Sequence, residues 1–102
     1  MSTVRFRDPA GSVRRGEWYG DAVSFGGQTY DLGAVDVLPP CDPTKIVCIG
    51  RNYAEHAEKS GNDLPDRPLL FLKPPNALSG HGDPVTLPAG KDRVDYEAEL
   101  GV

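Results

Sequence analysis

Two glutamates close to the end of the sequence have the spacing of a chemical site. Glu97 and Glu99 fall in an alternating apolar and acidic segment, residues 94–100, and the two-residue period of a strand places both carboxylates on one face. Like charges repel unless a cation lies between them, and Mg²⁺ or Mn²⁺ prefers such oxygen ligands. The solvent-facing side of an ordinary strand has the same spacing. Taken alone, the pair of glutamates favours this interpretation over a metal site. A metal site also needs a third ligand.

Three further side chains could act on a substrate. His56 falls in an expected helix, residues 53–59, whose dipole favours the neutral imidazole of a general base. Arg51 precedes this helix, where a guanidinium and backbone N–H groups can bind an anion. Lys73 ends an apolar segment, where its ammonium could reach a carboxylate or an enolate. Each is also typical of a solvated surface side chain, so both interpretations stay open.

The elements that must position these groups are short. Asn52 is a good N-cap with Glu55 three residues later, which predicts the helix at 53–59. Apolar runs predict four strands around it, at residues 45–49, 69–72, 85–87 and 94–100, the first of them buried and the last the clearest. His81 lies between two glycines and is expected in an exposed turn.

The first 38 residues indicate a small β meander. Val4 and Phe6 alternate with arginines, and the pairs Gly20-Asp21 and Gly26-Gly27 separate β-prone runs as hairpin turns do. Residues 39–43 are rich in proline and predict a stiff linker. We therefore expect a mainly β (β-rich α+β) fold with an N-terminal β subdomain, residues 1–40, and a second domain from residue 41 to 102.

The composition limits the class of protein. The 102 residues carry 11 basic and 15 acidic side chains, a net charge of −4, which argues against a nucleic-acid partner. Twelve glycines and ten prolines favour tight turns, and only 23 Val, Ile, Leu and Phe side chains favour a thin core. We expect neither a membrane span nor a signal peptide, free buried thiols at Cys41 and Cys48, and a cytoplasmic location.

Four segments occur in the order found in one enzyme family. They are KIVCIGRNYAEH at 45–56, PLLFLKPP at 68–75, GDPVTLP at 82–88 and DYEAEL at 95–100. In this order the segments resemble the opening of the catalytic domain in the fumarylacetoacetate hydrolase family. Residues 1–38 resemble the variable N-terminal subdomain of many members. The resemblance implies a catalytic domain of mixed β-sandwich or roll type, of which residues 41–102 form the first part.

The resemblance also implies a metal-dependent enzyme of small-molecule catabolism. Its substrates would be 2-oxo acids with a 1,3-dicarbonyl or enol relationship, as in acylpyruvates, and its reaction a hydrolysis, decarboxylation, hydration or isomerisation. The site residues carried over are His56 and Lys73 as catalytic groups, Arg51, Asn52 and Tyr53 as substrate-binding groups, and Glu97 and Glu99 as ligands of Mg²⁺ or Mn²⁺. A third ligand, an aspartate, is expected beyond Val102, so we expect the 102 residues alone to be an inactive fragment of a homodimeric enzyme.

One departure from the family pattern bears on the type of reaction. Members that hydrolyse or decarboxylate often pair the histidine with a glutamate three residues on, where this sequence has Lys59. Glu58 lies two residues after His56 and points away from it on a helix. The sequence therefore does not favour hydrolysis over the other family reactions. The alternative function is a non-catalytic remnant or small binding module of the same fold.

Overall fold

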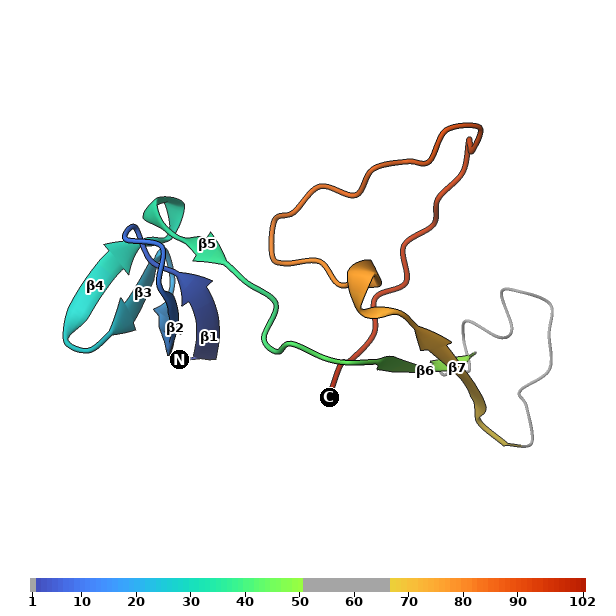
Figure 1. Ribbon diagram of the computed structural model, residues 1–102, viewed down its shortest axis with the longest axis horizontal. Coiled ribbons are helices and arrows are strands. Elements are labelled where there is room, and N and C mark those ends of the chain that lie inside the picture. The colour runs from blue at the N-terminus through green and yellow to red at the C-terminus, as the bar shows by residue number, and fades with distance from the viewer. Residues whose placement is uncertain (1, 51–66) are drawn as a thin grey trace.

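A computed structural model describes residues 2–50 and 67–102 as a mainly β chain with two sheets (Figure 1). The strands are β1 (Ser2–Arg7), β2 (Val13–Tyr19), β3 (Ala22–Phe25), β4 (Gln28–Asp31), β5 (Asp36–Val37), β6 (Ile46–Gly50) and β7 (Leu69–Lys73), with 3₁₀ turns η1 (Leu32–Ala34) and η2 (Pro75–Ala77). All pairings are antiparallel, in the orders β4-β3-β2-β1-β5 and β6-β7. The mainly β fold class is confirmed. The helix expected at 53–59 lies outside the described residues.

The predicted hairpins of the first sheet are confirmed. Tyr19 pairs with Ala22 across Gly20-Asp21, and Phe25 pairs with Gln28 across the two glycines. Gly26 and Gly27 both have positive φ, +59° and +79°, as a tight two-residue turn between right-twisted strands requires.

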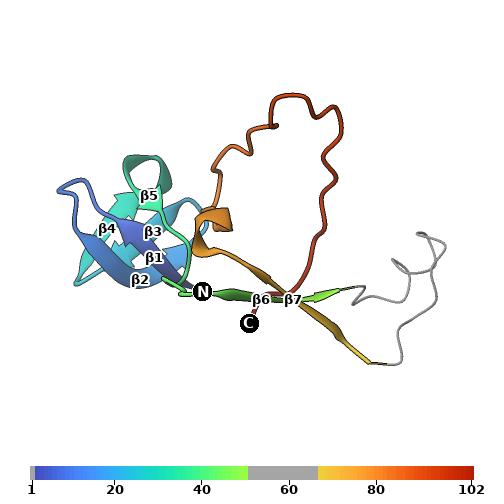
Figure 2. The ribbon, with the colours of Figure 1, turned by 45° about the vertical axis from the view of Figure 1, so that its right-hand side comes forward.

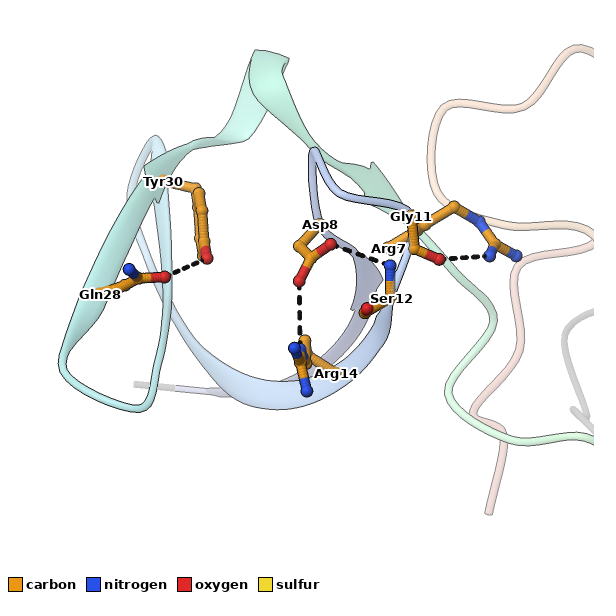
Figure 3. Close-up of polar contacts among 7 residues, drawn as sticks. All are labelled: Arg7, Asp8, Gly11, Ser12, Arg14, Gln28 and Tyr30. Carbon is orange, nitrogen blue, oxygen red and sulfur yellow. Dashed lines mark hydrogen bonds and ion pairs between the residues drawn. The ribbon is translucent and has the colours of Figure 1, made fainter.

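A buried aspartate closes the loop between β1 and β2. Asp8 Oδ1 accepts a hydrogen bond from the Ser12 N–H at 2.9 Å, and its Oδ2 accepts one from Arg14 Nε at 3.1 Å (Figure 3). The Ser12 N–H and then the Arg14 guanidinium hold the pKa of the Asp8 carboxyl below its usual value, against the opposing effect of burial. The same aspartate therefore fixes both the loop and the start of β2.

The core of the first sheet is small, as the composition predicts. Val4, Phe6 and Val23 are its buried side chains, and the Phe6 and Tyr30 rings meet edge to face at 6.0 Å. The sheet curls tightly around them at Gly16. A methyl group at this glycine would lie 1.9 Å from the Ser24 carbonyl oxygen and 3.2 Å from the Phe6 ring. Only glycine therefore permits this curvature.

The second sheet differs from its prediction in burial. The strands predicted at 45–49 and 69–72 form, as β6 and β7, with Val47 opposite Leu72. The first was expected to be buried, which is wrong: Val47 is 59% exposed, and Leu72 on its partner is 67% exposed. The reason is that no layer within the described residues covers either face of this two-stranded sheet.

The strands predicted at 85–87 and 94–100 do not form. Residues 83–102 contain one turn and are otherwise irregular, without a β-ladder. Val85 is 79% exposed and Tyr96 is 93% exposed. Alternation of apolar and polar residues stabilises a strand only when a neighbouring strand takes up its backbone hydrogen bonds and a core takes its apolar face, and the described part of the chain offers neither to these segments.

The proline-rich linker is irregular, as predicted, and is held by Arg5 of β1. The Arg5 guanidinium donates to the Pro39 carbonyl at 3.2 Å and forms an ion pair with Asp42 at 2.6 Å. The Leu38 N–H donates to the Arg5 carbonyl at 2.9 Å. These bonds set the direction in which the chain leaves the first sheet. Within residues 2–50 and 67–102, no helix is long and apolar enough to span a membrane.

Candidate functional site

Lys73 is placed at the end of a strand, as the sequence predicts. It is the last residue of β7 and pairs with Ile46 at the start of β6. Its side chain is exposed, and Pro74 and η2 follow directly. A lysine at the end of an apolar strand, followed by a rigid segment, has a fixed backbone from which its ammonium can reach a negatively charged substrate atom.

Glu97 and Glu99 lie on the extended C-terminal segment, and both are exposed. Asp95, which precedes them, is engaged by Arg93, whose Nε lies 3.1 and 3.0 Å from its two carboxylate oxygens. This hydrogen bond and the charge of Asp95 raise the pKa of Arg93. The negative charge of Asp95, Glu97 and Glu99 is therefore partly neutralised by Arg93 of the same segment.

The two glutamates suit a hard divalent cation by ligand type but do not complete a site. Among the described residues, no group of three His, Cys, Asp or Glu side chains is close enough to hold a metal ion. Two carboxylates leave most positions of an octahedral ion to other ligands. The described residues therefore do not form a metal centre by themselves.

The remaining predicted site residues cannot be placed. Arg51, Asn52, Tyr53 and His56, together with Glu58, lie outside the described residues. Their roles as catalytic and substrate-binding groups thus stay predictions.

A contact that sequence reasoning missed involves the exposed turn at His81. The turn forms as predicted, but the His81 ring packs edge to face on Trp18 of β2, with centroids 5.0 Å apart and planes at 88°. Trp18 Nε1 donates to the Gly20 carbonyl at 2.7 Å, which fixes the indole. No sequence pattern links residues 63 positions apart, so only the fold could show this pair.

Both cysteines are free, as predicted. Cys41 is exposed in the linker, which corrects the expectation that it is buried, and Cys48 is half-buried in β6. The linker runs outside the small core, because its prolines and the Arg5 contacts keep it in an irregular path.

The family model described as "Fumarylacetoacetate (FAA) hydrolase C-terminal" matches residues 45–102, more than half of the chain. The chain therefore belongs to the fumarylacetoacetate hydrolase family. The match contains β6, β7, Lys73 and both glutamates.

Known relatives extend the comparison. An uncharacterized protein of Archaeoglobus fulgidus is 46% identical over 83 residues, 81% of this chain and 33% of the relative. The mitochondrial oxaloacetate tautomerase of Caenorhabditis elegans is 48% identical over 59 residues, 58% of this chain and 28% of that protein. A solved structure from Mycobacterium abscessus is similar with a TM-score of 0.64 and 32% identity, over 88% of this chain and 40% of that one. The chain spans about a third or less of these curated relatives.

Proposed function

We propose that the complete protein containing this chain is a divalent-metal-dependent enzyme acting on 2-oxo acids with a 1,3-dicarbonyl or enol relationship. The observation that carries the proposal is the family match over residues 45–102, which includes Lys73, Glu97 and Glu99 in the family's order. Oxaloacetate, the substrate named for the relatives from Caenorhabditis elegans and Arabidopsis thaliana, belongs to this chemical class.

Among the family reactions, keto–enol isomerisation has the most support. The two relatives named as tautomerases are 48% and 44% identical to this chain over 59 residues. Lys59 stands where hydrolytic members often have a glutamate, which weakens the case for an activated water. Enolisation needs a proton to leave the carbon next to a carbonyl, and an enolate oxygen to be stabilised by positive charge.

The roles follow from the chemistry of each side chain. Lys73 and Arg51 hold the substrate oxygens as cations, with Asn52 and Tyr53 as further substrate contacts, and His56 accepts or donates the proton. Glu97 and Glu99 are two ligands of Mg²⁺ or Mn²⁺, with a further oxygen ligand from outside the described residues. The protein works as a homodimer in the cytoplasm, where the free thiols of Cys41 and Cys48 stay reduced.

The metal part of the proposal has a binding test that does not depend on turnover. Isothermal titration of the complete protein with Mg²⁺ or Mn²⁺ is compared with that of Glu97→Gln. The substitution keeps the size of the side chain and removes the charge, so we expect a loss of affinity of tenfold or more, on the order of 1.4 kcal/mol. Equal affinity of the two proteins would exclude Glu97 as a ligand.

A second function, a small binding module that folds by itself, is favoured by one observation. The first sheet has its own fully buried side chains, Phe6 of β1 and Val23 of β3. A module of this kind requires cooperative unfolding of the whole 102-residue chain, including β6 and β7. The exposure of those strands predicts that only the first sheet unfolds cooperatively. Hydrogen exchange during thermal unfolding distinguishes the two outcomes.

A further inference from the structure

The five-stranded sheet contacts a turn that lies within residues 45–102, the segment that matches the family model and is called the family domain below. This turn, residues 80–83, follows η2 and lies against the end of β5, next to the first sheet (Figure 2). Its His81 ring packs on Trp18 at 5.0 Å. The contact joins β2 to a segment more than 60 residues later in the chain.

The backbone of the turn is also closely packed, at Gly80. A methyl group at Gly80 would lie 2.9 Å from the Val37 carbonyl oxygen and 3.4 Å from Pro39 Cδ. The φ of Gly80 is not in the left-handed region, so the need for glycine here is a matter of space. The turn is also closed from within, because Asp83 Oδ2 accepts from the Gly80 N–H at 2.7 Å.

The sheet also contacts the linker that leads into the family domain. Arg5 binds the linker at Pro39 and Asp42, and Gly80 packs against Val37 and the same Pro39. The two connections between the first sheet and the rest of the described chain therefore meet at one place. One connection leads into β6, and the other leads away from β7.

Lys73 is connected to this place by a short, stiff segment. Six residues separate Lys73 from Gly80, and they begin with two prolines. The Ala77 N–H donates to the Pro74 carbonyl at 3.0 Å, and the Leu78 N–H donates to the Pro75 carbonyl at 3.1 Å. The segment between the end of β7 and the turn is therefore short and has internal hydrogen bonds.

We propose that the five-stranded sheet is a positioning element of the enzyme, with Trp18 and Gly80 as positioning residues that hold Lys73 in place through the 80–83 turn. The inference rests on the proposed function for the role of Lys73. The Archaeoglobus fulgidus relative supports it, because its match of 83 residues exceeds the 58 residues from 45 to 102 and so reaches into the first sheet. That protein therefore also carries sequence similar to part of the first sheet next to the family domain.

The contact itself is tested by fluorescence, because Trp18 is the sole tryptophan of the chain. Acrylamide quenching is measured on the 102-residue chain for the wild type, Gly80→Ala, His81→Ala and His81→Phe. We expect Gly80→Ala and His81→Ala to expose the indole and increase quenching, and His81→Phe to restore protection through its ring. Gly33→Ala is the matched control, because a methyl group there meets nothing within 4 Å. Unchanged quenching in both alanine variants would overturn the contact.

The positioning role is tested by kinetics on the complete protein with a 2-oxo acid such as oxaloacetate. Gly80→Ala and His81→Ala should lower kcat between about threefold and a hundredfold while the first sheet melts as in the wild type. His81→Phe and Gly33→Ala should keep the wild-type kcat. An active wild type with unchanged alanine variants overturns the positioning role alone, whereas an inactive wild type overturns the proposed function as well.

Discussion

The five-stranded sheet and the β6-β7 sheet are both antiparallel and built from short strands, yet only the first encloses a core. Phe6 and Val23 of the first sheet are fully buried, whereas Leu70 and Leu72 of β7 are 64% and 67% exposed. Strand pairing is complete in both sheets, with five residue pairs between β6 and β7. In this molecule, complete backbone pairing of strands therefore does not by itself bury their side chains.

The difference comes from curvature. Three consecutive hairpins and the close approach at Gly16 let the first sheet curl over its own apolar side chains. Two strands alone cannot curl around anything, and a two-stranded sheet in water is marginal at best. The first sheet should therefore carry most of the stability of the 102-residue chain, and β6-β7 little of it.

The largest expected effect is a difference in stability between variants of the two sheets. Phe6→Ala removes a fully buried ring and should lower the free energy of unfolding by about 3–5 kcal/mol, enough to unfold the first sheet. Leu72→Ala, at an exposed position of β7, should change it by about 0.5 kcal/mol or less. Thermal unfolding followed by circular dichroism measures both. Comparable losses in the two variants would contradict the difference between the sheets.

The next effect tests the curvature. Gly16→Ala places a methyl group 1.9 Å from the Ser24 carbonyl, so β2 and β3 must move apart. We expect a loss of about 1–3 kcal/mol, typical of overpacking. The control is Gly33→Ala, whose melting curve should match that of the wild type. If Gly16→Ala also melts like the wild type, the sheet does not need this close approach.

The smallest effect depends on pH and is confined to the first sheet. The pKa of Asp8 is below its usual value, 3.8, because of the Ser12 N–H and Arg14, so its charged form stabilises the fold. This contribution is complete above the unfolded-state pKa and is lost as the pH falls through the lower folded-state pKa. Melting temperatures from pH 7 to pH 2 should fall more steeply at the acid end for the wild type than for Asp8→Asn. If the melting temperatures of the wild type and Asp8→Asn fall in parallel with pH, Asp8 does not contribute to the acid sensitivity of the fold.

Local sequence patterns predicted the first sheet well, because its turns and its buried face are both specified by residues that are close together in the sequence. Glycine pairs mark its hairpins, and the alternation of Val4 and Phe6 with arginines marks its buried face. The strand predicted at 94–100 has an equally clear pattern, but its stability depends on partners elsewhere in the chain. The packing of His81 on Trp18 is likewise a long-range contact. Among the site residues, the sequence placed Lys73 at a strand end correctly, since strand ends are local features too.

The most direct test of the account is the turnover of an enolisable 2-oxo acid by the complete protein with Lys73 replaced. Lys73→Met keeps the length of the side chain and removes the charge, and Lys91→Met does the same at an exposed lysine of a turn. We predict that Lys73→Met lowers kcat/KM by about a hundredfold, as expected for loss of a charge that stabilises an enolate, while Lys91→Met keeps the wild-type value. Wild-type turnover by Lys73→Met would contradict the assignment of this lysine to the active site.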